Sequence, residues 1–335
     1  MSFRIHCAAV FLALAASLTT MAQPAPTPAK VILDTDIGDD VDDVFALALA
    51  LTSPEIKLVG ITSAWGDTAL RTRMINRLLC ETGRDDIPVH TGIATKATSQ
   101  FSQRAWANRG IQRPNEASAD AVEFLLDQIR QNPGEITLIA IGPLTNVGAA
   151  IDRDAATFSK LKRVVLMGGS INRSYDDFGY APPHTPSAEY NIAMDVRASQ
   201  KLFHSGVPIS MMPLDSTQVK FDEVKRSLLA SISTPLTDAL QVLTAEWARA
   251  NSMTTPTLFD PVAVAYAIRP ETCPTTPLRI EVDDKGFTRQ VEGAPNAQVC
   301  LEQRTDAFFN LLMPRLLTQR LSGSKVCTVP EPHAP

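Results

Sequence analysis

The chain has 335 residues, with 31 Lys and Arg against 36 Asp and Glu and a formal net charge of −5. Hydrophobic residues make up 44% and aromatic residues 6%, an ordinary globular composition that excludes an intrinsically disordered chain, a collagen-like repeat and a small disulfide scaffold. The acidic balance argues against nucleic acid or an anionic membrane as the main partner.

The N-terminal segment differs from the rest of the chain. Arg4 supplies a positive charge, residues 8–18 are apolar, and Thr20 and Ala22 place small residues before a cleavage site. This order is typical of a secretory signal peptide, so we expect residues 1–22 to be removed on export to the periplasm or beyond. The apolar run is too short for a membrane span, which needs about 20 residues. We therefore expect no stable membrane insertion after cleavage.

The following residues alternate short apolar runs with segments of helical period, after a flexible leader at 23–30. The expected pairs of strand and helix are 31–33 and 45–51, 57–61 and 70–80, 87–89 and 119–129, 136–141 and 143–151, and 163–167 and 197–204, followed by a strand at 207–212. Strands that alternate with helices indicate a mostly parallel sheet covered on both faces. We predict one doubly wound α/β domain over 31–320.

The C-terminal part is more helical and ends in a small β-hairpin and a tail at 321–335. The expected elements are helices at 222–232, 236–250 and 261–268, a hairpin of 278–282 and 287–291 with its turn at 283–286, a strand at 298–301 and a helix at 306–317. Two long connections, 91–117 and 170–190, are candidates for functional loops.

Four cysteines remain once Cys7 leaves with the signal peptide. An exported protein could pair them, and Cys273 with Cys300 or Cys300 with Cys327 are both plausible, but the sequence does not choose between pairings that also involve Cys80. No spacing of Cys and His indicates a zinc site.

Six aspartates fall within ten residues directly after the first expected strand, at positions 34, 36, 39, 40, 42 and 43. Ligands of open α/β sheets bind outside the carboxyl ends of the strands. Crowded carboxylates must be protonated or bind a cation, and their oxygens suit a hard ion such as Ca²⁺ or Mg²⁺. A helix N-terminus accounts only for Asp42 and Asp43. An EF-hand fits poorly, because Gly38 falls one position early in that loop. A phosphatase of the haloacid-dehalogenase type, with Asp34 as nucleophile, is the chief rival on this motif alone.

Several blocks in the same order resemble the nucleoside hydrolase family, the inosine/uridine-preferring N-ribohydrolases. The blocks are Leu33-Asp34-Thr35-Asp36-Ile37-Gly38 with Asp42-Asp43, Val59-Gly60-Ile61-Thr62 with Gly66-Asp67, Ile141-Gly142-Pro143-Leu144-Thr145-Asn146, Val165-Leu166-Met167-Gly168-Gly169, Ala188-Glu189-Tyr190-Asn191, and Asp260-Pro261-Val262-Ala263-Val264. They span residues 31 to 268, and the phosphatase interpretation has no comparable support downstream.

The resemblance implies hydrolysis of the N-glycosidic bond of ribonucleosides with a Ca²⁺-held water. Breaking this bond passes through an oxocarbenium-like sugar, so the site needs an activated water and negative groups near the developing cation. By resemblance, Asp36 is general base and metal ligand, and the other ligands are Asp43, the Ile141 carbonyl and Asp260. Asp34 and Asp40 support this shell. The residues expected to bind substrate are Asp42, Asp67, Met167, Glu189, Asn191 and Phe259.

The chain departs from the family pattern in three places. Three residues separate Gly38 from the final aspartate pair where many members have one, so the pair could instead be Asp39-Asp40. We favour Asp42-Asp43 because the helix follows directly. Asp67 replaces the commoner Asn.

The third departure is Phe259, which occupies the position of a His that protonates the leaving base. His184 is then the candidate acid in a plausible lid, or the base stacks on aromatic side chains and is protonated by solvent. The candidates for stacking are Phe259, Trp65, Tyr175 and Tyr180.

We therefore expect an exported ribohydrolase with Ca²⁺ as cofactor, a small nucleoside as substrate, and a homodimer or homotetramer as its assembly. One alternative is a ribohydrolase of another N-riboside, such as nicotinamide riboside. A second is a protein that binds Ca²⁺ and ribose without turnover.

Overall fold

The computed structural model describes residues 27–96, 98–110, 120–175, 185–323 and 327. The strands are β1 (Ala29–Thr35), β2 (Ile56–Ser63), β3 (Val89–Thr91), β4 (Thr137–Ala140), β5 (Arg163–Met167), β6 (Ile209–Met212), β7 (Thr276–Val282), β8 (Thr288–Val291) and β9 (Ala297–Val299). The helices are α1 (Asp42–Leu51), α2 (Thr68–Thr82), α3 (Arg104–Ala107), α4 (Ala121–Gln131), α5 (Thr145–Phe158), α6 (Tyr190–Ala193), α7 (Val196–His204), α8 (Leu214–Thr217), α9 (Glu223–Ala230), α10 (Pro235–Asn251), α11 (Pro261–Ile268), the 3₁₀ helix η1 (Pro270–Thr272) and α12 (Thr305–Thr318).

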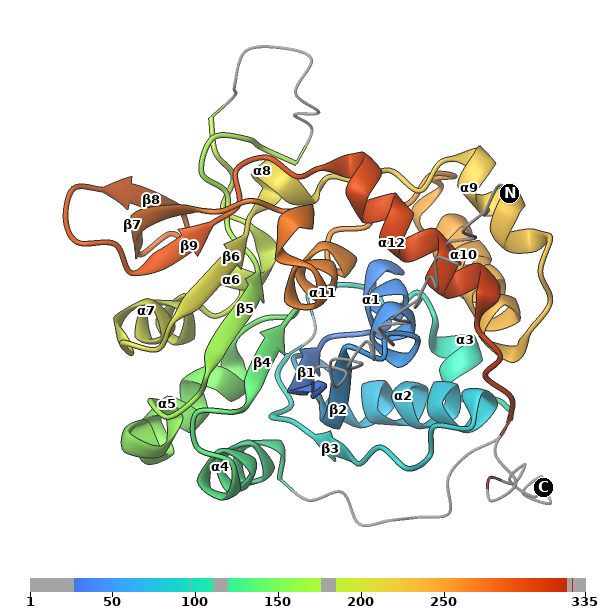
Figure 1. Cartoon of the computed structure of the whole chain (residues 1–335), viewed down its shortest axis with the longest axis horizontal. Coiled ribbons are helices and arrows are strands. Elements are labelled where there is room, and N and C mark those ends of the chain that lie inside the picture. The colour runs from blue at the N-terminus through green and yellow to red at the C-terminus, as the bar shows by residue number, and fades with distance from the viewer. Residues whose placement is uncertain (1–26, 97, 111–119, 176–184, 324–326, 328–335) are drawn as a thin grey trace, which may run out of the picture.

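The strands form one sheet with the order β3-β2-β1-β4-β5-β6-β9-β7-β8. All pairs from β3 to β9 are parallel, while β7 pairs antiparallel with both β9 and β8. In Figure 1 the central strands lie side by side with helices around them, and the β7–β8 hairpin projects at one end. The mostly parallel, doubly wound α/β sheet is confirmed.

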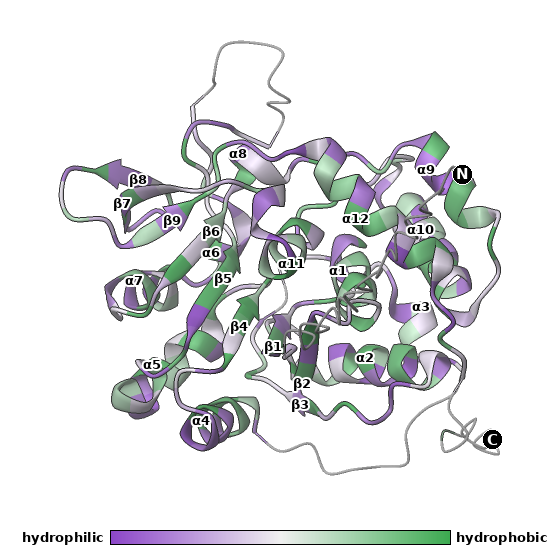
Figure 2. Ribbon diagram, in the orientation of Figure 1, coloured by the Kyte–Doolittle hydropathy of each residue, from purple (hydrophilic) through white to green (hydrophobic). Residues whose placement is uncertain are grey.

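The two faces of the sheet are covered by different helices because side chains alternate along each strand. Val31 and Leu33 of β1 pack in one apolar cluster with residues of α1, α2, α10, α11 and α12. Ile32 points the other way, into a cluster with residues of α4, α5 and α7. Figure 2 shows the hydrophobic colour concentrated on the central strands β4 and β5. None of the helices in the described part of the chain combines the length and the apolar character needed to cross a membrane.

The strand boundaries differ from the sequence prediction by one or two residues at several ends. β1 begins at Ala29, within the expected leader, because Ala29 and Lys30 continue the ladder to β2 at Ile56 and Lys57. The backbone ladder thus extends beyond the apolar run. The hairpin is confirmed, but it belongs to the main sheet, because β9 joins β7 to β6. The short helices α3, α6 and α8 were not predicted, since four residues are too few to show a helical period.

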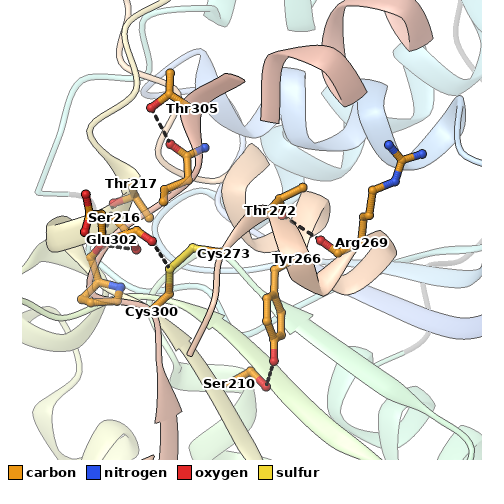
Figure 3. The surroundings of a disulfide bond; sticks show 12 residues. Ser210, Ser216, Thr217, Tyr266, Arg269, Thr272, Cys273, Cys300, Glu302 and Thr305 are labelled. Atoms are coloured by element: carbon orange, nitrogen blue, oxygen red, sulfur yellow. Dashed lines mark hydrogen bonds between the residues drawn. A yellow bond between two sulfur atoms is a disulfide. The ribbon is translucent and has the colours of Figure 1, made fainter. Parts of the chain in front are cut away.

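Two disulfides are present, Cys80 with Cys327 and Cys273 with Cys300. The second is one of the two pairings that the sequence left open. Cys273 directly follows η1 and Cys300 directly follows β9, so this bond ties the end of the helical segment to the sheet (Figure 3). The neighbouring Tyr266 hydroxyl of α11 lies 3.3 Å from the Ser210 hydroxyl of β6, a second polar link between the same layers.

Candidate active site

A cleft of about 280 Å³ opens at the carboxyl ends of β1, β4 and β5. Asp36 follows β1, Ile141 follows β4, and Met167 is the last residue of β5. The site residues expected from the sequence that line this cleft are Asp36, Asp40, Asp42, Asp43, Ile141, Met167, Glu189, Asn191, Phe259 and Asp260. The parallel topology explains this gathering, because parallel strands bring their carboxyl ends to one edge.

Three buried carboxylates form the core of the site. Asp42 and Asp43 begin α1, Asp260 directly precedes α11, and one oxygen of each lies within 4.8 Å of the others. The two helices pack against each other, and the Asp260 backbone N–H donates to Asp42 Oδ2 at 3.3 Å. The Thr35 hydroxyl donates to Asp43 Oδ1. Three convergent carboxylates are a donor set that suits a hard divalent cation.

The geometry favours Asp42-Asp43 over Asp39-Asp40 as the pair in this group. Asp39 Oδ2 instead accepts from Arg71 Nη2 at 2.9 Å, and Asp40 Oδ1 accepts from the backbone N–H of Val41 at 2.6 Å. Both still line the cleft. The three residues between Gly38 and Asp42 therefore form a loop in which Asp39 pairs with Arg71 and is not part of the cluster.

Asp36 lies in the same cleft, outside this group of three. A Cβ on Gly142 would lie 2.8 Å from Asp36 Oδ1 and 2.9 Å from the Asp36 backbone nitrogen. Glycine at 142 therefore lets the loop after β4 approach Asp36 closely, and the preceding residue Ile141 lines the same cleft.

Burial in an acidic surrounding favours the protonated form of these groups. Burial raises the pKa of Asp36 to about 7, against the opposing effect of the Arg71 charge. Burial first, and repulsion from neighbouring carboxylates second, raise the pKa values of Asp42, Asp43 and Asp260 well above the ordinary value. A bound cation would remove this penalty, because it supplies the opposite charge at the point of crowding.

Asp34 lies behind the cluster, as expected of a supporting residue. Its Oδ1 accepts from the Thr62 hydroxyl of β2 and from Asn146 Nδ2 at 2.8 Å. Asn146, at the start of α5, also donates to the Ser63 carbonyl at 3.0 Å and accepts from the Ile93 N–H at 3.0 Å. It thereby joins β1, the end of β2 and the loop after β3, a contact set that the sequence did not reveal.

Glu189 and Asn191 form the opposite wall. Glu189 is the N-cap of α6, and its carboxylate accepts from the N–H groups of Gly169, Asn191 and Ile192 at 2.8, 3.0 and 3.2 Å. Asn191 Nδ2 donates to the Met167 carbonyl at 3.1 Å. These bonds fix both side chains before any ligand arrives, and both face the cleft.

The remaining wall is aromatic and amide in character. Phe259 and Tyr175 line it, with their ring centroids 6.1 Å apart in an edge-to-face arrangement. Trp247 and Asn251 of α10 join them, four residues apart on one helix face. These two were missed, because α10 reads from the sequence only as an amphipathic helix.

Asp67 and Trp65 do not line the cleft. Asp67 Oδ1 caps α2 by accepting from the Leu70 N–H at 3.0 Å, and its side chain lies 3.9 Å from Arg104. The Trp65 carbonyl accepts from Arg71 Nε at 2.8 Å. His184 and Tyr180 lie outside the described residues.

The segment 98–103 covers the acidic loop, and the sequence did not predict this contact. The Ser102 hydroxyl donates to the Asp39 carbonyl at 2.7 Å, and Gln103 Nε2 donates to the Asp40 carbonyl at 2.7 Å. Ser99 and Ser102 line the cleft. Only the length of the loop at 91–117 signalled a function here.

Comparison with known proteins identifies relatives over part of the chain. Probable uridine nucleosidase 2 of Oryza sativa subsp. japonica is 36% identical over 212 residues, 59% of this chain and 60% of that protein. Pyrimidine-specific ribonucleoside hydrolase RihB of Escherichia coli O157:H7 is 34% identical over 198 residues, 56% of this chain and 60% of that protein. The matches thus span less than two thirds of these relatives.

Solved structures match over more of the chain. The plant nucleoside hydrolase PpNRh1 superposes with a TM-score of 0.77 at 26% identity, covering 87% of this chain and all of that one (100%). The purine-preferring ribonucleoside hydrolase from Gardnerella vaginalis gives 0.74 at 26% identity, covering 86% of this chain and 98% of that one. The sequence profile of the inosine-uridine preferring nucleoside hydrolases matches residues 31–310, which leaves no support for a haloacid-dehalogenase-like phosphatase. The chain belongs to the inosine-uridine preferring nucleoside hydrolase family.

Proposed function

We propose that this protein hydrolyses the N-glycosidic bond of ribonucleosides, with Asp36 as general base and Ca²⁺ as cofactor. The observation that carries the proposal is the single cleft in which Asp36 and the three convergent carboxylates face Glu189 and Asn191. Family membership supports the reaction class.

The donor set supports a metal at this position. Asp42, Asp43 and Asp260 offer oxygens that converge within 4.8 Å, and Asp36 and the Ile141 carbonyl line the same cleft. Oxygen donors alone suit Ca²⁺ better than a transition metal. When bound, the cation would supply positive charge that orients the sugar hydroxyls and acidifies a water.

The side chains that line the cleft have different roles in the proposed reaction. Asp36 accepts a proton as the water oxygen forms its bond to C1′ of the ribose. The C1′–N bond breaks, and its electron pair leaves with the base. Glu189 and Asn191, held by their backbone contacts, bind ribose hydroxyls, while the surrounding carboxylates stabilise the positive charge that develops on the sugar. The departing base takes a proton from solvent while Asp36 releases its own, so the products are ribose and the neutral free base.

The aromatic wall favours a second candidate substrate class. Phe259 faces the cleft and cannot donate a proton to a departing base. An N-riboside with a cationic base, such as nicotinamide riboside, needs no such proton, because its base leaves as a neutral molecule. Ribosides of this kind are therefore the second candidate for the same site.

The test measures release of free base and ribose from a panel of inosine, guanosine, uridine, cytidine and nicotinamide riboside. The protein would be used with Ca²⁺, with chelator, and as Asp36→Asn. Release that is lost with chelator and in Asp36→Asn supports the proposal, and the panel separates the two substrate classes. Ribose-dependent binding with no release from any riboside would instead support a binding protein without turnover.

Export and assembly are part of the proposal. The order of charged, apolar and small residues at 1–22 supports a signal peptide, and two disulfides are typical of an oxidising compartment. N-terminal sequencing of protein from the producing cells tests cleavage after Ala22. Light scattering of the purified protein tests the homodimer or homotetramer, and a monomer would refute that assembly.

A further inference from the structure

Arg71 of α2 is the largest fully buried side chain of the described residues, with 1% of its surface exposed. A buried guanidinium is costly unless its charge is paired and its N–H groups are hydrogen-bonded. No part of the mechanism above uses this side chain. Its partners therefore indicate what the fold gains from it.

All three nitrogens of the Arg71 guanidinium contact the loops after β1 and β2, of which the first lines the cleft. Nη1 donates to the carbonyl oxygens of Asp36 and Ile37, the latter at 3.0 Å. Nε donates to the Trp65 carbonyl at 2.8 Å, and Nη2 donates to Asp39 Oδ2 at 2.9 Å. One side chain thus ties the loop after β1 to the loop after β2.

The side chain does not reach the cleft, whose described lining includes neither lysine nor arginine. Phe101 closes the other side of the guanidinium, with its ring centroid 5.3 Å from Cζ. The same ring lies against Gly38, where a Cβ would be 2.1 Å from the ring and where φ is +125°. Arg71 therefore acts on the site through the loop that it holds and through its charge, which partly offsets the burial that raises the pKa of Asp36.

Asp39 is the charge partner of this arginine. It belongs to the residues added between Gly38 and Asp42, and its carboxylate also accepts from the Ser99 hydroxyl of the segment 98–103. The ion pair between Arg71 and Asp39 is almost fully buried on the arginine side, at 2% exposure, and 16% exposed on the aspartate side. The added aspartate compensates the buried cation and leaves the carboxylate cluster to other residues.

We propose that Arg71 is a positioning residue that fixes the backbone of Asp36, and that Asp39 orients its guanidinium. This inference rests on the proposed function for its kinetic consequence, but its structural part concerns the geometry of the acidic loop alone. A lysine at 71 keeps the positive charge but has no planar fork, so it cannot contact both loops and Asp39 together.

The test compares Arg71→Lys with Arg77→Lys. Arg77 lies on the same helix and makes the same kinds of contact, with Glu81 at 2.7 Å, the Trp106 carbonyl and the Trp106 ring, away from the cleft. Each variant is titrated with Ca²⁺ after chelation, with the unfolding temperature as the readout. Values of kcat and KM are measured with the best riboside of the panel.

For Arg71→Lys we expect Ca²⁺ affinity and kcat each to fall by about tenfold or more, since small displacements of catalytic groups have effects of this size. KM should change by less than about threefold, because ground-state contacts remain. Arg77→Lys should leave all three within about twofold, as expected for a partly exposed pair. Equal losses in both variants would overturn the proposal, because they would report only on the stability of α2.

Asp39→Asn keeps the proposal testable if Arg71→Lys does not fold. This variant retains the three carbonyl contacts and removes the carboxylate that orients Nη2, so we expect kcat to fall by about threefold to tenfold. The unfolding temperature should also fall, because the buried guanidinium loses its charge partner. A kcat equal to that of the natural protein would overturn the role of Asp39. If no riboside is hydrolysed, the proposed function fails, while the Ca²⁺ titration of Arg71→Lys still decides the positioning role.

Discussion

Replacing one carboxylate of the cluster should make the protein insensitive to the cation without destabilising the metal-free fold. Oxygens of Asp42, Asp43 and Asp260 lie within 4.8 Å of one another. At this distance two ionised carboxylates repel each other by about 3 kcal/mol at an effective dielectric constant of about 20. Asp43→Asn removes one of these charges and preserves the size of the side chain. The chelated variant should therefore be as stable as the chelated natural protein, or more stable.

The natural protein should gain stability from the cation by mass action. At a free concentration of about 100 times Kd, a ligand that binds only the folded state adds about 2.7 kcal/mol. For a domain of this size, about 2 °C of unfolding temperature corresponds to each kcal/mol, so we expect an increase of about 5 °C. Asp43→Asn should lose most of this increase, because its amide carries no charge for the cation to neutralise.

The assay is thermal unfolding followed by circular dichroism, with chelator and with increasing Ca²⁺ or Mg²⁺. The control is Asp152→Asn, which removes an exposed carboxylate that pairs with Lys201 on the surface. This control should show the same increase as the natural protein. The reasoning is refuted if saturating cation leaves the natural protein unchanged, or if Asp43→Asn keeps the full increase.

Four further outcomes are expected. The chelated protein should lose stability as pH rises from about 4 to about 7, because burial raises the folded-state pKa of Asp36 to about 7 and of Glu189 to about 6. The stability from these groups is fully present below their unfolded pKa and is lost as pH rises through the folded pKa. Urea unfolding midpoints at each pH test this, and a flat profile would contradict it. Gly142→Ala places a Cβ 2.8 Å from Asp36 Oδ1, so kcat should fall by about tenfold or more while the protein remains folded. A kcat equal to that of the natural protein would exclude the close approach of residue 142 to Asp36. Cys300→Ser removes a disulfide whose cysteines are 27 residues apart, which should lower the free energy of unfolding by about 3.5 kcal/mol. Guanidinium titrations measure this loss, and a value below about 1 kcal/mol would argue against a stabilising disulfide. Phe259→His introduces a proton donor, so the rate of inosine or uridine hydrolysis, divided by the rate for nicotinamide riboside, should rise by about tenfold or more. An unchanged ratio would show that protonation of the leaving base does not limit the reaction.

The sheet could be predicted because its strands are short apolar runs at regular intervals. β5 was placed at its exact bounds, since Arg163 and the glycine after Met167 delimit a single apolar run. The start of β1 was missed, because Ala29 and Lys30 join the ladder through backbone contacts that do not depend on side-chain polarity. The periodicity of side chains reports burial, and Ala29 and Lys30 at the start of β1 are only partly buried.

The acidic part of the cleft could be predicted for a topological reason. The strands β1, β4 and β5 are neighbours in a parallel sheet, so their carboxyl ends lie side by side. Asp36 and Ile141 follow the first two strands and Met167 ends the third, which brings these residues together. Arg71 could not be found in this way. An arginine in the second turn of a helix is usually exposed, and its burial depends on loops that come from elsewhere in the chain.

The aromatic and amide part of the cleft depends on tertiary packing and not on strand order. Trp247 and Asn251 reach the cleft because α10 packs on the same face of the sheet as α1. Phe259 reaches it because it directly precedes Asp260, the N-cap of α11. Substitutions in α10 change the surface offered to the base without touching the carboxylates, because the two sets lie on different elements. The sheet edge and α10 therefore contribute separate parts of the cleft lining. Phe259, Trp247 and Asn251 form the aromatic and amide wall of the cleft. We therefore expect substitutions at these three residues, and not in the acidic loop, to change which riboside is hydrolysed.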